Sequence, residues 1–502
     1  MPADVILDPP VSAWTTGSDL AAVLADPAED RVLVVPLSAG ATAEEAAALT
    51  AAGLDPADVL DTHEPERTAG AVTRVSLRPG AHPARRLLLV GVGDGTLDAW
   101  RSAGAEVGRA TRGLAAAVHA LGSPAADVLA AWVEGCVLGG WTSPRWTKDG
   151  PVAGVDPVGS AVVVADTDEA DDLVRRAVVV SRAQLVARGL AVTPANIKNP
   201  AWMAAQARTL ADRHGLDVTV WDEKALASEG FGGLLAVGAG SASPPRLVRV
   251  DHTPPSAVPT TPRVVLVGKG ITFDTGGLQI KPSDGMLAMK TDMSGSAIVL
   301  AVVAACAELD VPVRVTALLA LAENAVDGAS YRPGDVVTQY GGTTVEIGNT
   351  DAEGRIVMAD ALAYADEQLD PDVLLDIATL TGAARIALAR VMAPLFATDD
   401  ALADALVRAG ESSGETVWRM PLADAYRRAL DSDVADLTHI ADGVGGGAVT
   451  AALFLREFVG QRRWAHLDIA GTGRSDVDAG VNAKGGTGFG TRLLLRWLEE
   501  TR

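Results

Sequence analysis

Residues 264–294, VVLVGKGITFDTGGLQIKPSDGMLAMKTDMS, join a buried-strand pattern to an unusual set of ionisable side chains. The stretch opens with four apolar residues, which is typical of a buried strand in a parallel sheet. The chain has only seven lysines, yet three of them lie here among aspartates: Lys269, Lys281 and Lys290, with Asp274, Asp284 and Asp292. Because the pKa of a lysine falls readily on burial or beside a metal, this pattern indicates that amines are required here.

An alternative is that the stretch is a solvated surface loop, since charge runs usually lie on the surface. The flanking residues argue against this. A glycine turn follows Asp274 directly, and the apolar residues 294–309 predict a helix that Ser294 caps. Ionisable groups between the end of a strand and the start of a helix are typical of functional sites in α/β proteins.

A second acidic stretch, TTVEIGNTDAEGRIVMADALAYA, covers residues 343–365. We expect a short strand at 345–348, a turn at Asn349 and Thr350, and a helix after Gly354. Asp351 and Glu353 are two residues apart, so in an extended or turning backbone they can face the same way. On this local pattern a structural alternative stays open, in which Asp351 is an N-cap and Glu353 belongs to a first helical turn.

Four carboxylates from the two stretches can converge: those of Asp274, Asp292, Asp351 and Glu353. Packed together without compensation, they would raise one another's pKa. Two divalent cations that share bridging oxygens would instead neutralise them. The sequence therefore predicts a site for a pair of metal ions.

The segments GKGITFDTGG, IKPSDGMLAMKTDMSG and NTDAEGR resemble the signature blocks of the leucyl aminopeptidase family, the two-metal peptidases of the M17 type. Their order and spacing also match. The similarity continues through DIATLTGA and WAHLDIAGTG, so that it covers residues 192–502. Before residue 192 the likeness is one of general architecture.

The resemblance implies a role for each matching position. The five metal ligands would be Lys269, Asp274, Asp292, Asp351 and Glu353. Lys281 would act as an electrophile on the scissile carbonyl, and Arg355 would hold a bicarbonate ion that serves as general base. The implied substrate-binding residues are Met289, Asn349, Ala352, Thr379, Leu380 and Gly382. For Met289 and Ala352, which would line an apolar pocket for the first side chain, ordinary core packing is the alternative.

Physical chemistry is consistent with these implied roles. A metal-bound Lys269 must be neutral, and two adjacent dications would lower its pKa enough. A charged Lys281 would stabilise the developing oxyanion, an effect of about 3–4 kcal/mol. The planar fork of Arg355 suits a carbonate-like anion, and an external base is expected because all four carboxylates bind metal.

The ligand types leave the identity of the metal open. Carboxylate oxygens suit Mn²⁺ or Mg²⁺, whereas a neutral lysine nitrogen suits Zn²⁺ or Co²⁺. We expect Mn²⁺ or Zn²⁺. No HExxH motif occurs, which excludes a thermolysin-type zinc site.

The sequence departs from the family pattern in two places. At residues 442–447, DGVGGG, the family more often has an upstream Asn and a basic residue near the glycines, where this chain has His439, Gly443 and Val444. Arg385 and Arg390 are also unusual, because the region after TLTG tends to be apolar. These changes bear on the rim of the specificity pocket or on subunit contacts, and so on substrate preference.

The composition is that of a globular protein with two or more domains: 502 residues, 48% hydrophobic and 21% charged. We see no signal peptide and no apolar run long enough to cross a membrane, and we expect Cys136 and Cys306 to be buried, reduced thiols. These features predict a cytoplasmic protein. The net charge of −22 argues against a nucleic-acid partner, since phosphate binding needs a basic surface.

Residues 32–183 alternate between strand and helix patterns, which predicts an open α/β unit. Residues 98–122 predict one long helix, with His119 as a packed or surface side chain. The GVGDG sequence at 91–95 is more typical of a tight strand–helix turn than of a dinucleotide site, because the full GxGxxG spacing is missing. Residues 141–156 are rich in turn formers and predict a loop.

We therefore predict an α/β protein of two domains, each a mostly parallel sheet flanked by helices, with the larger C-terminal domain catalytic. Residues 1–168 would form an N-terminal domain that serves in oligomerisation or as an accessory. Residues 169–191 would form a linking helix, and residues 192–502 the two-metal peptidase domain.

The predicted function is metal-dependent release of N-terminal residues, preferably leucine and other apolar ones, from short peptides. The resemblance implies a homohexamer with its sites facing an interior space. Two other classes stay open. A DNA-binding role for the N-terminal domain is disfavoured by the acidity of the chain. A two-metal phosphoesterase usually needs further cations or histidines for the phosphoryl oxygens.

Overall fold

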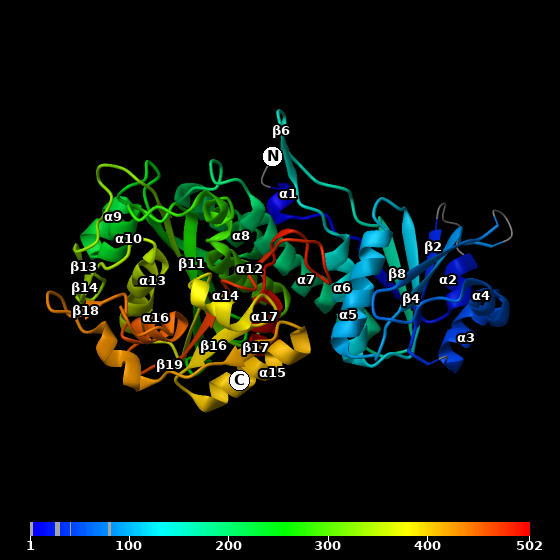
Figure 1. The fold of residues 1–502 in the computed structure, drawn as a ribbon. Helices are drawn as coiled ribbons and strands as arrows, with labels where there is room; N and C mark the ends of the chain where they lie inside the picture. The colour runs from blue at the N-terminus through cyan, green and yellow to red at the C-terminus, as the bar shows by residue number, and fades with distance from the viewer. Residues whose placement is uncertain (1–3, 26–30, 41, 79–81, 502) are drawn as a thin grey trace. The chain divides into compact units, whose positions relative to one another are not determined.

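The computed structural model describes residues 4–25, 31–40, 42–78 and 82–501. The chain divides into two compact units, and Figure 1 labels many of their helices and strands. The first unit comprises Met1–Leu185 with Val477–Lys484, and the second comprises Val186–Asp476 with Gly485–Arg502. Both units are built on mostly parallel sheets with flanking helices, so the predicted fold class is confirmed. The segment Val477–Lys484 belongs to the first unit although it lies far along the chain, a membership that local patterns did not predict.

The first unit contains a six-stranded sheet in the order β1-β8-β5-β2-β4-β3. Neighbouring strands are parallel except for the antiparallel pair β3 and β4. The strands are β1 (Ala13–Gly17), β2 (Arg31–Leu37), β3 (Val72–Ser76), β4 (Arg86–Gly91), β5 (Ala116–Gly122) and β8 (Ser160–Ala165). The helices are α1 (Asp4–Leu7), α2 (Leu20–Ala25), α3 (Ala43–Ala51), α4 (Pro56–His63), α5 (Leu97–Ala110) and α6 (Ala126–Gly140).

The prediction of one long helix at 98–122 is wrong. Helix α5 ends at Ala110, and residues 116–122 form strand β5 between β2 and β8. Gly113 has a φ of 72°, a left-handed conformation that breaks the helix. The alanines of β5 favour a helix by propensity, but burial inside a parallel sheet overrides that preference. His119 consequently lies on a central strand and is only 1% exposed.

The predicted loop at 141–156 contains a short antiparallel hairpin of β6 (Arg145–Thr147) and β7 (Gly150–Val152). The chain then continues through the long helix α7 (Ala170–Val192). Cys136 and Cys306 are both buried and free, as predicted.

The second unit contains an eight-stranded sheet in the order β17-β16-β19-β15-β11-β12-β10-β9. Its four central strands are parallel to one another, and antiparallel pairs occur on both sides of them. The strands are β9 (Asp217–Trp221), β10 (Arg246–His252), β11 (Arg263–Asp274), β12 (Arg314–Asn324), β15 (Val373–Ala378), β16 (Ala393–Ala397), β17 (Val417–Arg419) and β19 (Arg463–Asp468). Two smaller sheets consist of β13 (Val336–Thr338), β14 (Thr344–Glu346) and β18 (Leu437–Thr438), and of β20 (Arg474–Ser475) and β21 (Gly485–Gly486).

Helices connect the strands of this second sheet. They are α8 (Pro200–His214), α9 (Glu223–Glu229), α10 (Gly232–Gly238), α11 (Ser283–Met286), α12 (Ser294–Glu308), α13 (Glu353–Tyr364), α14 (Gly382–Leu388), α15 (Asp400–Ser413), α16 (Gly447–Arg456) and α17 (Thr491–Glu500). Three further segments have 3-10 or π-helical geometry: η1 (Met289–Thr291), η2 (Ala365–Leu369) and η3 (Asp424–Leu430).

Strand β11 is buried on both faces. Successive side chains point to opposite faces of the sheet, and both faces are covered by helices. Val265 and Val267 belong to a core cluster with residues of α10, α13 and α16. Val264 and Leu266 point to the opposite face, where α12 packs. The strand extends further than the apolar run predicted, since pairing with β12 continues to Asp274, so that Lys269 lies within the strand.

The start of α12 corrects one sequence prediction. Ser294 is the first residue of the helix, and the N-cap is Met293, which makes no side-chain cap. The backbone already turns helically through η1, and the Ser294 hydroxyl donates to the Thr291 carbonyl at 2.6 Å. A serine before an apolar run is therefore not a cap when the preceding residues are themselves helical.

We expected no apolar run long enough to cross a membrane, but one helical stretch meets the length and composition that a membrane span requires. The 26-residue stretch Ser283–Glu308 has a mean hydropathy of 1.4 over its most apolar window. However, 72% of that window is buried inside the structure. Its apolar character is explained by packing of α12 against the central strands.

We predict that His119 destabilises the protein in acid. Burial lowers its pKa to about 3, against 6.5 for an ordinary histidine, so the unfolded chain binds more protons between these values. The free energy of unfolding should therefore fall as the pH drops through that window. The contribution of His119 to this fall, from pH 7 to pH 5, should be roughly 2 kcal/mol.

Urea unfolding at pH 7 and pH 5 measures this effect. His119→Gln keeps an acceptor for the Trp132 indole N–H, which donates to His119 Nδ1 at 3.2 Å, but does not titrate. The difference between pH 7 and pH 5 should be smaller in this variant by roughly 2 kcal/mol, whereas a variant of the exposed His63, His63→Gln, should keep the wild-type difference. An equal difference in His119→Gln and wild type would contradict the prediction.

Candidate active site

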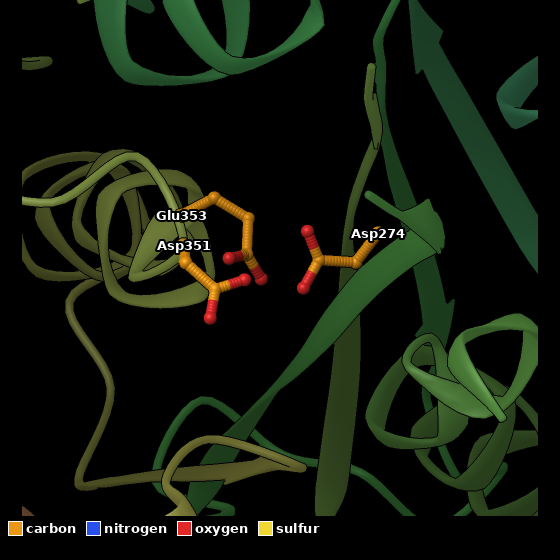
Figure 2. A group of neighbouring side chains, drawn as sticks. All are labelled: Asp274, Asp351 and Glu353. Carbon is orange, nitrogen blue, oxygen red and sulfur yellow. The ribbon is translucent and has the colours of Figure 1, made fainter. Parts of the chain in front are cut away.

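Three carboxylates meet where β11 ends and α13 begins. Asp274 is the last residue of β11, Glu353 is the first residue of α13, and Asp351 lies in the turn before it. Figure 2 shows Asp351 and Glu353 side by side, with their carboxylates pointing toward that of Asp274. One oxygen of each residue lies within 4.8 Å of the others. The two acidic stretches of the sequence therefore converge, as expected.

Lys269 joins the fourth carboxylate to this group. Its Nζ lies 2.8 Å from Asp292 Oδ2 and 2.8 Å from Glu353 Oε1. Nζ also donates to the Thr379 carbonyl at 3.1 Å. Because Asp292 directly follows the short turn η1, the entry into α12 sets the position of this carboxylate.

Lys281 lies on the opposite side of the cluster, in the loop after β11. Its Nζ is 2.7 Å from Asp274 Oδ2 and also forms an ion pair with Asp351 Oδ1. The five predicted ligands and Lys281 thus form one connected group of charges. The local alternative of Asp351 as an N-cap does not hold, because the N-cap of α13 is Ala352.

Burial and mutual repulsion perturb the carboxylates of this group. Burial, together with repulsion from Glu353 and Asp274, raises the pKa of Asp292 to about 8. Burial also raises the pKa of Asp274 and that of Asp351. Burial opposes the charged form of Lys269, but Asp292 and Glu353 outweigh it and raise the pKa of the ammonium group. The site therefore needs compensating positive charge.

The donor set fits divalent cations. Among the described residues, three buried carboxylate oxygens have only a lysine ammonium as partner and so keep a lone pair for a cation: Asp292 Oδ2 and Glu353 Oε1 beside Lys269, and Asp351 Oδ1 beside Lys281. Such oxygens are hard ligands with free lone pairs, which is what Mn²⁺, Mg²⁺ or Zn²⁺ requires. Asp274 differs, because its Oδ1 accepts hydrogen bonds from the backbone N–H of Gly276 and from the side-chain amide of Asn324.

Asn324 supports Asp274, and the sequence analysis did not identify it. The Asn324 amide donates to Asp274 Oδ1 at 2.8 Å and to the Thr350 carbonyl at 3.0 Å. Asn324 is the last residue of β12 and stands opposite Asp274 in the parallel register. The signal available in the sequence was a polar residue at the end of a second apolar strand.

Asp468, also missed, holds the loop after β15. It is the last residue of β19, and its Oδ1 accepts from the backbone N–H of Leu380 at 3.1 Å and of Thr381 at 3.3 Å. Its Oδ2 accepts from the Thr381 hydroxyl at 2.6 Å. Thr379 donates in turn to Asp292 Oδ1 at 2.7 Å, so this loop also orients a candidate ligand.

His439, one of the departures from the family pattern, is a buried brace. His439 Nε2 lies 2.9 Å from the carbonyl oxygen of Asn349. His439 Nδ1 accepts a hydrogen bond from the backbone N–H of Gly348 at 3.3 Å. Its own carbonyl accepts from Arg355 Nη1 at 2.6 Å. Burial and the Arg355 charge lower the pKa of His439 to about 4, so the ring is neutral at pH 7.

A cavity of about 390 Å³ opens beside the charged cluster. It is lined by the five candidate ligands, Lys281 and four of the predicted substrate-binding residues: Met289, Thr379, Leu380 and Gly382. Asn349, Ala352 and Arg355 are not among its lining residues. Arg385, Arg390 and Arg474 also line the cavity. Fold and site together define an α/β protein with a carboxylate-rich candidate metal site in a cavity at the carboxyl edge of a mostly parallel sheet.

Comparison with known proteins identifies the family. Residues 185–495 match the model of the cytosol aminopeptidase family, catalytic domain (M17). The probable cytosol aminopeptidase of Leifsonia xyli is 41% identical over 479 residues, which cover 93% of each chain. That of Micrococcus luteus is 45% identical over 456 residues, covering 86% of this chain and 88% of the relative.

Among solved structures, the bottromycin maturation enzyme BotP in complex with Mn is similar, with a TM-score of 0.83 and 35% identity, covering 94% of this chain and 99% of that one. The chain belongs to the cytosol aminopeptidase family. It is therefore a metal-dependent aminopeptidase, a hydrolase of peptide bonds. The resemblance stated from the signature blocks is confirmed.

We predict that Gly354→Ala disrupts the site. A Cβ at this position would lie 2.4 Å from Lys269 Cε and 2.8 Å from its Nζ, which forces the lysine out of its ion pairs. Misplacement of a site group by about 1 Å costs roughly 100-fold in kcat/KM. The measurement is hydrolysis of leucine p-nitroanilide, with circular dichroism to verify folding.

Gly285→Ala is the matched control, because an added Cβ there meets no atom within 4 Å. It should behave as wild type. Full activity of Gly354→Ala would show that the observed position of Lys269 is not needed.

Proposed function

We propose that the chain releases N-terminal residues, leucine and other apolar residues preferentially, from short peptides with the aid of two divalent cations. The convergence of four carboxylates and Lys269 beside the cavity carries this proposal. Lys269, Asp274, Asp292, Asp351 and Glu353 would hold the ions. Met289 and Leu380 offer apolar surface for the first side chain.

When bound, the two ions supply a nucleophilic water at neutral pH and polarise the scissile carbonyl. Lys281 stabilises the oxyanion that develops on that carbonyl. Its ion pairs with Asp274 and Asp351 fix the ammonium group at the edge of the cluster and raise its pKa, so that it stays charged. One such donor contributes about 3–4 kcal/mol to stabilisation of the transition state.

Arg355 holds a bicarbonate ion as general base in this proposal. No carboxylate of the cluster is free for that task once all four bind metal. Arg355 lies two residues after Glu353, and its Nε is buried without a hydrogen-bond partner among the described residues. A buried guanidinium with an unused donor is suited to a small anion.

We propose Mn²⁺ or Zn²⁺ as the metal, a homohexamer as the assembly and the cytoplasm as the location. The similar BotP structure is a complex with Mn, which favours Mn²⁺. The relatives are named cytosol aminopeptidases. Three strongly exposed apolar side chains of the second unit suit contacts between subunits: Leu287 at 82%, Ile386 at 87% and Val391 at 75% exposure.

We expect Glu353→Gln to lose both metal and activity. The variant keeps the shape of the side chain but removes the charge of a central ligand, so metal content and kcat/KM for leucine p-nitroanilide should fall by about 100-fold or more. Activity should return to chelated wild type on addition of Mn²⁺ or Zn²⁺, and an N-acetylated substrate should be inert.

Glu411→Gln serves as the control, since Glu411 is exposed on α15. It should retain metal and activity. If Glu353→Gln kept both, the two-metal assignment would be wrong.

We also expect the reaction to depend on bicarbonate. In carbonate-free buffer kcat should fall by about 100-fold, the lower end of the range for general-base catalysis, and millimolar bicarbonate should restore it. Arg355→Gln should be slow and insensitive to bicarbonate. A wild-type rate that is equal with and without bicarbonate would contradict the role given to Arg355.

A further inference from the structure

Three arginines line the cavity, and two of them, Arg385 and Arg390, lie in the region after TLTG where the resemblance led us to expect apolar residues. Arg385 lies near the end of α14, Arg390 follows that helix, and Arg474 begins β20. All three line the same cavity as the candidate metal ligands. We call these three residues the arginine rim.

The arginine rim carries excess positive charge. Asp476 is shared by two of its members: its Oδ2 lies 2.9 Å from Arg390 Nη2, and its Oδ1 lies 3.0 Å from Arg474 Nη1. Within the part of the chain that the structure describes, Arg385 has no assigned ion pair or hydrogen bond. Three cations thus face one anion, in a chain whose net charge is −22.

Contacts within the rim fix part of its geometry. Arg390 Nη1 donates to the Arg474 carbonyl at 3.1 Å, so the end of α14 is tied to β20. The segment after β19 packs closely against α14, because a Cβ on Gly471 would lie 2.1 Å from the Ala389 carbonyl oxygen. The arginine rim is therefore formed by two chain segments in direct contact, the end of α14 with Arg390 and the segment that leads into β20.

Guanidinium groups suit carboxylates. The planar fork of an arginine can bind both oxygens of a carboxylate at once, which gives orientation as well as attraction. A peptide whose amino end lies at the metal ligands can extend across a cavity of about 390 Å³ toward the rim. The group on a short peptide that matches the rim is a carboxylate.

We propose that the arginine rim binds a carboxylate of the substrate and thereby selects anionic peptides. The inference rests on the proposed aminopeptidase function. Two parts of a peptide carry this group: the free C-terminus of a di- or tripeptide, and the side chain of an aspartate or glutamate. Recognition of the first would favour very short peptides, and recognition of the second would favour acidic residues.

Solvent limits the size of the effect. The side chains of Arg390 and Arg474 are 35% and 33% exposed, so their attraction for a carboxylate is screened by water and salt. We expect a preference of about fivefold, the upper end for exposed ion pairs, and we expect it to shrink in 0.5 M NaCl.

Two pairs of substrates, assayed on the metal-loaded enzyme, test the inference. Leucyl-glycine against leucyl-glycinamide compares a free with a blocked C-terminus. Glutamate p-nitroanilide against glutamine p-nitroanilide compares a charged with a neutral side chain of similar shape. The quantity measured is the ratio of kcat/KM within each pair, at low and at high salt.

In wild type, at least one of the two ratios should be about five in favour of the carboxylate, and the pair that responds identifies its source. In Arg385→Gln and Arg474→Gln that ratio should fall toward one. Arg408→Gln, a change of an exposed arginine on α15 away from the cavity, should keep the wild-type ratio.

Ratios near one for both pairs in wild type would overturn the inference, as would a preference that persists in both rim variants. Failure of the proposed function looks different. In that case wild type would hydrolyse none of the four substrates, the neutral ones included.

Discussion

Compensation of buried negative charge is the constraint on which the catalytic unit depends. Asp274, Asp292, Asp351 and Glu353 lie too close together to be stable as isolated anions in a buried site. In the structure the ammonium groups of Lys269 and Lys281 supply the opposite charge. In the proposed metal-bound site the ions would supply it together with Lys281, and Lys269 would be a neutral ligand. Because the carboxylates come from three places, the end of β11, the residue after η1 and the turn into α13, charge compensation also ties these segments together.

A set of neutral and charged braces keeps these loops in place. Asn324 holds Asp274, Asp468 holds the loop after β15, and His439 links the turn before α13 to Arg355. Each of these residues makes hydrogen bonds to the backbone that fix where a segment runs, and Asn324 and Asp468 also orient the side chains of Asp274 and Thr381. Rigid positioning of this kind is what a metal site needs to keep its ligand geometry.

The cavity has a reacting side and a recognition side made from different parts of the chain. The candidate ligands belong to strand ends and helix starts of the central sheet, whereas the arginine rim belongs to α14, the residue after it and β20. This separation lets substrate preference change without altering the metal ligands.

The sequence alone determined the α/β class, the family and the residues that form the charged cluster, because their motifs are local and strongly patterned. It misassigned residues 116–122, where alanine propensity favours a helix and only burial between β2 and β8 selects a strand. Tertiary structure alone brought Asn324, Asp468 and Arg474 to the site. These residues act through partners that are distant in sequence, and no local pattern encodes which strand ends and loops will meet.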